Sequence, residues 1–370
     1  LGAFLVFNSK NVRYLTGVRP DTRWIDLFRG RFTILTESGE PHLFELGGDW
    51  RCVAISAPWL KDRLHIAESW GMAAPHVEKV TERWADAVRK VLKDEGVEKE
   101  VLGTDSLDNY GAKALEKVGI KSTDGNLALG DARSVKTQDE LQLLKMVHAI
   151  NDAAYAEVER VMRPGMKESD IAVIITKELF ELGDEGHSLI IVASGNNSNP
   201  YRRSFTDRVI QYGDLVIVDM GGIFNGYVAD TCRTYFCGAK ATEEQKEAYR
   251  ECYEMLYKAI RAIRPGRSTA EIAKLWPAPY RGMSALEMLT LQHGHGMGLL
   301  GYDPPFITQA YSPENPQEIK ENMFLCVETY VPSPDGYNGV RLEEGMVVTS
   351  TGVEIASKAT IKPEELDWMK

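Results

Sequence analysis

Two histidines stand one residue apart in the glycine-rich stretch LQHGHGMGLL, which runs from Leu291 to Leu300. Glycines this dense indicate a backbone that passes close to other groups or needs dihedral angles that a side chain would forbid. His293 or His295 could therefore bind a metal ion, although a single histidine is more often a hydrogen-bonded structural residue. Acidic residues elsewhere in the chain bear on the choice between these interpretations.

Two aspartates lie on neighbouring predicted strands. Asp219 ends the apolar run of GDLVIVDMGG, and Asp230 lies in GYVADTCRTYF. The Asn225-Gly226 pair between them is typical of a two-residue hairpin turn. Such a turn would place Asp219 opposite Cys232 and Asp230 diagonally from Asp219 on the same face, with their Cα atoms ~7 Å apart. Two buried carboxylates repel each other unless a proton or a cation lies between them, and a divalent ion with oxygen ligands meets that need.

Two glutamates repeat this pattern. Glu328 lies in MFLCVETYV and Glu343 in GVRLEEGMVV, two strand-like runs joined by PSPDGYN. Charged residues inside apolar runs are rarely fully buried without a partner. An ordinary ion pair, such as Glu343 with Arg341 or Asp230 with Arg233, would explain any one of these acids. Considered together with the histidine, the four acids favour a metal centre.

The first part of the chain alternates short strands and helices. GAFLVFN, RFTILTE and PHLFEL are apolar runs separated by turn residues, and VTERWADAVRKVLKDEG has helical spacing, with Thr81 as a candidate N-cap. This pattern predicts an α/β domain over residues 1–132.

From residue 133 the pattern changes. A long amphipathic helix begins after Thr137, has Glu140 in the capping-box position and stops at Pro164-Gly165. The phrases VMRPGMKESDIA and AIRPGRSTAEIA lie about 100 residues apart and form an internal repeat. We therefore expect a second domain over residues 133–370, with two similar halves that each place two helices on one side of an antiparallel sheet.

The bulk properties bear on partners and location. The chain of 370 residues has a formal net charge of −11, which argues against a nucleic-acid partner. No apolar stretch approaches the ~20 residues that span a bilayer, and the first residues lack the pattern of a signal peptide. The five cysteines are scattered and form no CxxC pair, so reduced thiols in a cytoplasmic protein are expected.

Seven motifs resemble those of the creatinase/prolidase/methionine-aminopeptidase superfamily, the "pita-bread" metallohydrolases of family M24. In the family's order they are RYLTG, DARSVKTQDELQLL, GDLVIVDMGG, GYVADTCRTYF, GHGMGL, ENMFLCVETYV and GVRLEEGMVVTSTG. The resemblance implies a creatinase-like α/β N-terminal domain and an α+β pita-bread catalytic domain with a curved antiparallel sheet and internal pseudo-symmetry. It also implies a homodimer in which Trp24 closes the site, with core packing as the alternative role for Trp24.

The resemblance further implies a centre of two divalent ions, for which Mn²⁺, Co²⁺, Fe²⁺ and Zn²⁺ are all candidates. Asp219 would chelate one ion, while Asp230 and Glu343 would bridge the two. His295 would bind the second ion together with Glu328, which would also act as the general base. The earlier histidine of the pair would be a structural neighbour.

Such a centre can lower the pKa of a shared water, present it as a metal-bound hydroxide and polarise a carbonyl. The resemblance implies cleavage of a small peptide after its N-terminal residue, as in Xaa-Pro dipeptidases and aminopeptidases.

The accessory histidines of the peptidases are replaced in this chain. Their positions hold Tyr201 or Arg202 before the first aspartate, Leu291 before the ligand histidine, and Tyr302 after it. A tyrosine can donate a hydrogen bond to an oxyanion, although it does not shuttle protons as histidine does. We therefore expect catalytic roles for Tyr302 and Arg202 and substrate binding by Tyr201 and Arg341. A surface ion pair with a nearby aspartate is the alternative role for Arg202.

Other activities on the same fold remain alternatives. SGNNSNPY and CVETYVPSPDGYNGVRLEE are similar to the branch that contains dimethylsulfoniopropionate lyases, which act on a small acid. Those lyases carry an extra aspartate where this chain has Gly221. Creatine- and ectoine-type amidohydrolases, or a binding protein without activity, are further alternatives. A metal-dependent hydrolase of peptide-like substrates is the leading hypothesis.

Overall fold

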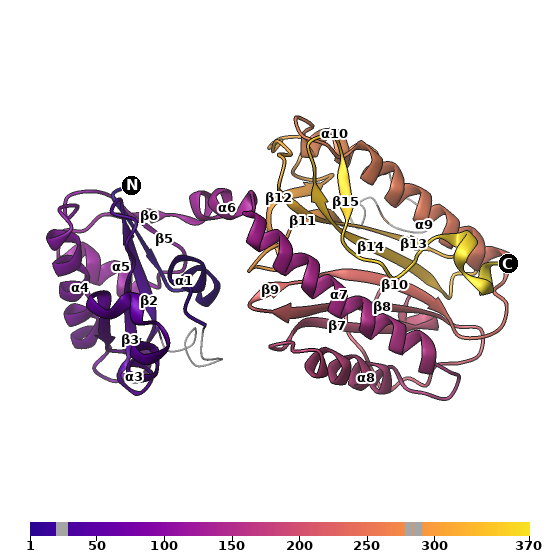
Figure 1. Ribbon diagram of the computed structural model, residues 1–370, viewed down its shortest axis with the longest axis horizontal. Helices are drawn as coiled ribbons and strands as arrows, with labels where there is room; N and C mark the ends of the chain where they lie inside the picture. The colour runs from indigo at the N-terminus through magenta and orange to yellow at the C-terminus, as the bar shows by residue number, and fades with distance from the viewer. Residues whose placement is uncertain (20–28, 278–283, 285–290) are drawn as a thin grey trace. The chain divides into compact units, whose positions relative to one another are not determined.

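The computed structural model describes residues 1–19, 29–277, 284 and 291–370 (Figure 1). The chain divides into two compact units, Leu1–Ala132 and Arg133–Lys370. Trp24, which the sequence suggests as a residue that closes the site, lies outside the described residues.

The first unit contains a six-stranded mixed sheet in the order β4-β3-β2-β1-β5-β6. Its strands are β1 (Ala3–Val6), β2 (Phe32–Thr36), β3 (His42–Leu46), β4 (Leu64–Ala67), β5 (Leu102–Thr104) and β6 (Ser122–Asp124). Its helices are α1 (Ser9–Thr16), α3 (Gly47–Ser56), α4 (Val77–Asp94) and α5 (Asn109–Lys117), and α6 (Asn126–Ser134) ends just beyond the unit. An aromatic cluster packs one face of the sheet against α4 and includes Phe7, Phe32, Trp70 and Trp84. The predicted α/β class is confirmed.

The start of α4 differs from the prediction. The helix begins at Val77, a full turn before the expected boundary, so Thr81 is inside the helix. The Thr81 hydroxyl donates to the carbonyl oxygens of Val77 and Glu78 at 3.1 and 3.0 Å. Threonine satisfies its hydroxyl equally well at a cap and by such backward bonds, and the residue type alone therefore does not set the boundary.

The second unit contains a nine-stranded sheet in which every named pair is antiparallel. Seven strands follow the order β12-β11-β13-β14-β10-β8-β7, while β15 pairs with β14 and β9 with β8. The strands are β7 (His187–Ser194), β8 (Leu215–Phe224), β9 (Tyr227–Val228), β10 (Thr231–Phe236), β11 (Gln292–Gly296), β12 (Asp303–Thr308), β13 (Phe324–Pro332), β14 (Gly339–Val348) and β15 (Val353–Ile355). Short 3₁₀ helices cover Gly195–Asn197, Pro363–Glu365 and Asp367–Met369 in this unit. Two more, Pro58–Arg63 and Trp70–Met72, belong to the first unit.

Four helices cover one face of this sheet. They are α7 (Gln138–Val161), α8 (Glu168–Glu181), α9 (Glu243–Ala262) and α10 (Thr269–Ala273). In Figure 1, α8 runs along β7, and α9 runs along β13 and β14. Val218 and Met220 of β8 pack against α7 and α8, and Leu325 and Val327 of β13 pack against α9. Because strand side chains alternate, the residues between them face the opposite side of the sheet.

The predicted internal repeat has a structural counterpart. The long helices α7 and α9 both begin with a capping box, at Thr137 and Thr242. After each helix a glycine with positive φ turns the chain, Gly165 at 94° and Gly266 at 83°. The backbone N–H of each glycine donates to an isoleucine carbonyl, that of Ile210 in one half and that of Ile319 in the other. The two halves are thus built in the same way, as the sequence predicts.

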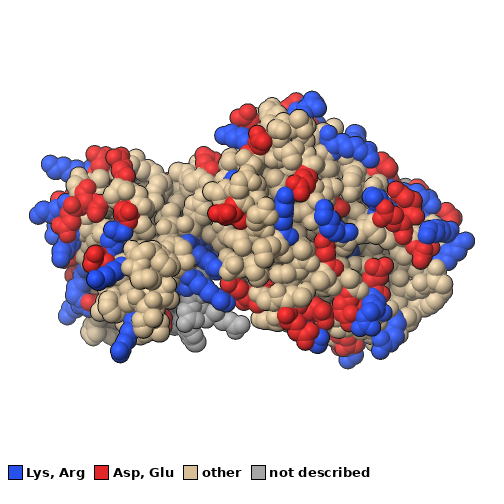
Figure 2. Space-filling view, in the orientation of Figure 1, with Lys and Arg blue, Asp and Glu red and all other residues tan. Residues whose placement is uncertain are grey.

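Acidic and basic side chains are intermixed over the surface shown in Figure 2. On α8, for example, Lys177 Nζ lies 2.8 Å from Glu181 Oε2. Among the described residues, no helix is both long and apolar enough to cross a membrane.

Gly345 of β14 provides a test of the packing between the sheet and α7. A Cβ atom at this position would overlap the buried His148 ring, with Cδ2 at 2.6 Å. Overpacking of this kind costs about 1–3 kcal/mol, and we expect Gly345→Ala to lower the free energy of unfolding by that amount. Gly352→Ala is the matched control, because no atom lies within 4 Å of its added methyl group. Chemical denaturation of both variants checks the prediction, and equal stability would contradict it.

Candidate metal centre

The hairpin between β8 and β9 sets the register of the first two acidic residues. Phe224 pairs with Tyr227, and Asn225 and Gly226 form a two-residue turn with φ angles of 48° and 80°. Both angles are positive, as a type I′ turn requires. Farther along, Asp219 lies opposite Cys232, which confirms the predicted register.

The register continues across the sheet and aligns three of the acids. Cys232 of β10 pairs with Glu343 of β14, and Glu343 pairs with Glu328 of β13. Directly opposed residues in an antiparallel sheet point to the same face. Asp219, Glu343 and Glu328 therefore form one row, with Cys232 between the first two, on the face opposite α8 and α9.

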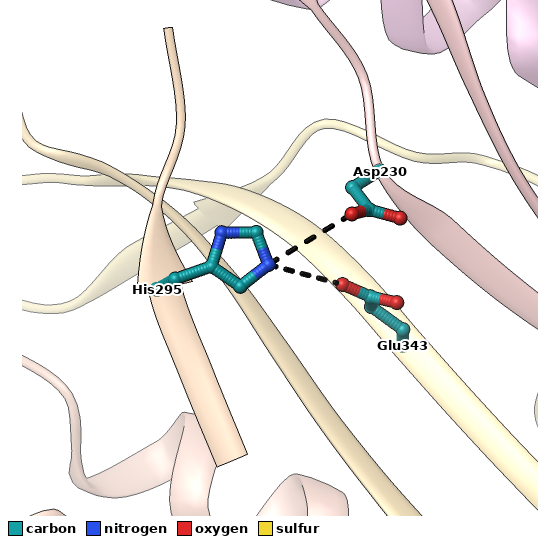
Figure 3. Close-up of side chains that lie close together, drawn as sticks. All are labelled: Asp230, His295 and Glu343. Atoms are coloured by element: carbon teal, nitrogen blue, oxygen red, sulfur yellow. Dashed lines mark ion pairs between the residues drawn. The ribbon is translucent and has the colours of Figure 1, made fainter. Parts of the chain in front are cut away.

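Asp230, His295 and Glu343 converge from three segments of the chain, as Figure 3 shows. All three are buried, and one potential ligand atom from each lies within 4.8 Å of the other two. His295 Nε2 is 3.9 Å from Asp230 Oδ2 and 3.8 Å from Glu343 Oε1. These distances are too long for hydrogen bonds and leave space between the atoms. His295 Nδ1 lies 3.0 Å from the Gly296 carbonyl oxygen, so Nδ1 carries the ring proton and Nε2 is left as a free lone pair.

The unpaired atoms in this cluster fit a divalent cation. Four buried atoms have no hydrogen-bond partner in the described structure: Asp219 Oδ1, Asp230 Oδ1, Glu343 Oε1 and His295 Nε2. An unsatisfied buried polar atom costs ~1–3 kcal/mol, so four in one place are unusual in a merely structural cluster. Carboxylate oxygens with one imidazole nitrogen form a donor set that first-row divalent ions accept.

Arg341 neutralises the two remaining predicted ligands. Its Nε lies 3.3 Å from Asp219 Oδ2, and its Nη2 donates to Glu328 Oε2. The Tyr201 hydroxyl donates to the same Asp219 oxygen at 2.8 Å, and the guanidinium carbon lies 5.0 Å from the centre of the Tyr201 ring. Asp219 thus has one oxygen held by Arg341 and Tyr201 and one oxygen unpaired.

The two ion pairs considered as alternatives to a metal are not found among the described residues. Arg341 pairs with Asp219 and Glu328, and Arg233 pairs with Glu344 at 2.9 Å. Glu344, which follows the predicted ligand Glu343, points to the opposite face of β14 and accepts the hydrogen bond from Arg233.

The electrostatics of the cluster follow from burial. Burial, together with the charges of neighbouring acids, raises the pKa values of both Asp230 and Glu343. Burial lowers the pKa of His295 to about 4, and the charge of Arg341 adds to this effect. The acids therefore resist ionisation while no further cation accompanies Arg341, and a divalent ion would favour their charged forms.

The other predicted site residues occupy different surroundings. The Tyr302 ring lies against His295 with the ring centres 4.4 Å apart, and 52% of the residue is exposed. Arg202 is exposed, and its Nε donates to Ser204 Oγ at 3.3 Å. The structure therefore brings Tyr201, Tyr302 and Arg341 to the cluster but does not bring Arg202 to it.

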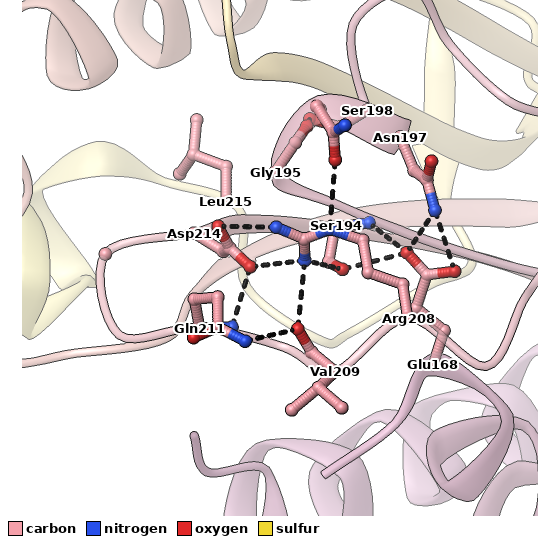
Figure 4. A network of polar contacts seen from close by, with 12 residues as sticks. Glu168, Ser194, Gly195, Asn197, Ser198, Arg208, Val209, Gln211, Asp214 and Leu215 are labelled. Carbon is pink, nitrogen blue, oxygen red and sulfur yellow. Dashed lines mark hydrogen bonds and ion pairs between the residues drawn. The ribbon is translucent and has the colours of Figure 1, made fainter. Parts of the chain in front are cut away.

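A buried network that holds the loop before β8 was missed in the sequence (Figure 4). Glu168 is fully buried and accepts hydrogen bonds from Ser194, Asn197 and Thr206. These bonds anchor the segment 194–206, which carries Tyr201. Glu168 is visible in the KESDIA phrase that follows the Pro164-Gly165 turn, but only the folded chain shows its partners.

Comparison with known proteins relates this geometry to a family. Residues 142–350 match the model of "Metallopeptidase family M24". The "Probable dipeptidase PepE" of Mycobacterium tuberculosis is 29% identical over 246 residues, which cover 65% of this chain and 62% of that protein. The match thus spans less than two thirds of that relative's length. The "Xaa-Pro dipeptidase" of Pyrococcus horikoshii is 26% identical over 97% of this chain and 93% of its own length.

Solved structures show the same fold. The Xaa-Pro dipeptidase from Bacillus anthracis superposes with a TM-score of 0.78 at 22% identity, covering 97% of this chain and 93% of that structure. The prolidase from Pyrococcus furiosus gives a TM-score of 0.75 at 22% identity, covering 97% of both. These likenesses confirm the predicted pita-bread architecture.

Removal of the Arg341 charge tests the balance of charges in the cluster. We expect Arg341→Met to lower the free energy of unfolding by ~3–5 kcal/mol in the presence of a chelator, because two buried carboxylates lose their partner. The loss should be smaller with saturating divalent metal, which would neutralise the same acids. Arg83→Met is the control, because the Arg83–Glu68 pair is exposed and its loss should change the free energy of unfolding far less. Denaturation with and without metal gives the answer, and a metal-independent loss would contradict the prediction.

Proposed function

Because the chain belongs to metallopeptidase family M24, we propose that it is a metal-dependent peptidase that acts on small peptides, of the Xaa-Pro dipeptidase or aminopeptidase type. The observation that carries the proposal is the convergence of buried, unpaired atoms from Asp230, His295 and Glu343 on one face of the sheet. The names of the relatives, dipeptidases and Xaa-Pro dipeptidases, support the substrate class.

Two divalent ions, chosen from Mn²⁺, Co²⁺, Fe²⁺ and Zn²⁺, would be held by five side chains: Asp219, Asp230, His295, Glu328 and Glu343. Ions at such a site supply a water of lowered pKa and polarise the carbonyl of the scissile bond. Asp219 can offer its unpaired Oδ1 while Oδ2 keeps its bonds to Tyr201 and Arg341.

Side chains of the protein would transfer the proton and position the reacting groups. Glu328 would accept a proton from the attacking water and deliver it to the leaving amine. Tyr201 and Arg341 orient the Asp219 carboxylate. Burial and the nearby acids raise the pKa of Tyr302, so its hydroxyl stays protonated at neutral pH. Tyr302 would therefore donate a hydrogen bond to the substrate oxygen that becomes negative.

The geometry around Gly221 argues against the lyase alternative. A Cβ atom there would overlap Ser188 Oγ and lie 2.5 Å from the Ala229 carbonyl oxygen. The backbone oxygen cannot move aside as a flexible side chain can. An aspartate at this position, which the lyase branch carries, would therefore not fit the present strand arrangement.

Metal reconstitution tests the proposed activity. Protein stripped by a chelator and reloaded with Mn²⁺, Co²⁺ or Zn²⁺ should hydrolyse Xaa-Pro dipeptides in a steady-state assay. Asp230→Asn and His295→Ala should each lower kcat/KM by at least ~100-fold, because loss of a ligand should exceed the 10- to 100-fold effect of losing its outer-shell partner.

Asp86→Asn is the control for these substitutions, because Asp86 is exposed on α4 and should leave the rate unchanged. Protein that binds metal stoichiometrically but cleaves none of the peptides would refute the proposal.

The cytoplasmic location and the homodimer stay predictions. We expect sedimentation velocity to give a species of twice the 41.4 kDa chain mass. A monomer at micromolar concentration would contradict this expectation and remove the proposed role of Trp24 at the site of a second copy.

A further inference from the structure

His293 is a buried histidine that the metal cluster does not use. It is fully buried in β11, and its ring stacks on the Trp276 indole with centres 4.3 Å apart and an interplanar angle of 16°. Neither Nδ1 nor Nε2 has a hydrogen-bond partner in the described structure. Stacking covers one face of the ring and leaves its polar edge unsatisfied.

Other buried histidines of the chain are anchored differently. His148 Nδ1 lies 2.7 Å from the Leu144 carbonyl oxygen, and His295 Nδ1 lies 3.0 Å from that of Gly296. In both residues one ring nitrogen donates to the backbone and so fixes the ring. A histidine kept only for packing would be expected to make such a bond, because buried polar atoms are nearly always paired.

The strand is irregular at His293. Gln292 pairs with Thr308 and Gly294 with Ile307, so two steps along β11 match one step along β12, and His293 is the unmatched residue. Such bulges re-aim a side chain and are common beside active sites.

The opposite edge of β11 places His293 near the acidic row. Gly294 pairs with Val327 and His295 with Cys326, and the next step of this register leads from His293 to Glu328. Burial lowers the pKa of His293 to about 3, and the charge of Arg341, which pairs with Glu328, adds to this effect. Arg341 Nη1 is also buried without a partner.

A neutral imidazole offers one donor and one acceptor on its edge. A peptide group offers the complementary pair, a carbonyl oxygen and an N–H. We propose that His293 is a substrate-contacting residue, whose ring edge hydrogen-bonds to a peptide group of the bound substrate on the Glu328 side of the metal cluster. This inference rests on the proposed peptidase function and adds a binding residue to it.

The variant His293→Phe separates a role in substrate binding from a role in folding. Phenylalanine keeps the stacking on Trp276 and removes both unsatisfied nitrogens. We expect the thermal midpoint of the metal-loaded protein to stay the same or rise, with unchanged metal stoichiometry. In contrast, kcat/KM for Xaa-Pro dipeptides should fall by about 10-fold or more, mainly through KM, because the substrate loses its hydrogen bonds.

His148→Phe is the matched control. It removes a nitrogen that is already bonded to a backbone carbonyl, so the thermal midpoint should fall. His293→Asn and His293→Gln add a second test, because each amide restores a donor and an acceptor near one of the two ring nitrogens. Partial recovery of KM by either variant supports the inference and identifies the nitrogen that contacts the substrate.

The possible failures are distinguishable. A folded His293→Phe protein with unchanged kcat/KM would overturn the inference and leave the peptidase proposal intact. A His293→Phe protein that loses stability as His148→Phe does would show a structural role and would also overturn it. Metal-loaded wild-type protein that neither cleaves the dipeptides nor binds them in isothermal titration calorimetry would overturn both proposals.

Discussion

Repulsion between buried carboxylates is the constraint on which the second unit depends. Asp219, Asp230, Glu328 and Glu343 lie on one face of the sheet, and each is nearly inaccessible to water. Arg341 compensates two of them, and the remaining charge can be balanced only by protons or by cations. Without a bound cation, the repulsion between these carboxylates destabilises the fold, and positive charge in the site relieves it. The packing of the surrounding elements must therefore hold the acids together.

The face opposite the acids carries the stability that holds them. Val218 and Met220 alternate with Asp219 and pack against α7 and α8, so the same strand is anchored on one face and reactive on the other. Tyr155 of α7 donates to the carbonyl oxygens of Val218 and Thr231 at 3.3 and 2.5 Å, which fixes the backbone on both sides of the aspartates. The hydrophobic contact between helices and sheet thus compensates for electrostatic strain on the other side.

Unsatisfied polar atoms are concentrated at this face. They include atoms of four predicted ligands, of Arg341 and of His293, whereas the equally buried Glu168 has all of its bonds made within the loop that it anchors. Full pairing is typical of residues that support a structure, and missing partners are typical of residues that bind something else. The contrast separates the framework from the site more clearly than burial or charge does.

Local patterns in the sequence determined much of this architecture. The Asn225-Gly226 turn specified the pairing of Asp219 with Cys232, and the capping box at Thr137 set the start of α7, because both depend only on neighbouring residues. Thr81 misled the prediction, since a hydroxyl can bond forward or backward along the chain. The partners of Arg341 and the unpaired edge of His293 were decided only by the tertiary structure. They depend on the register between strands that lie far apart in the chain and on the face to which each side chain points, and neither is encoded in a local pattern of residue types.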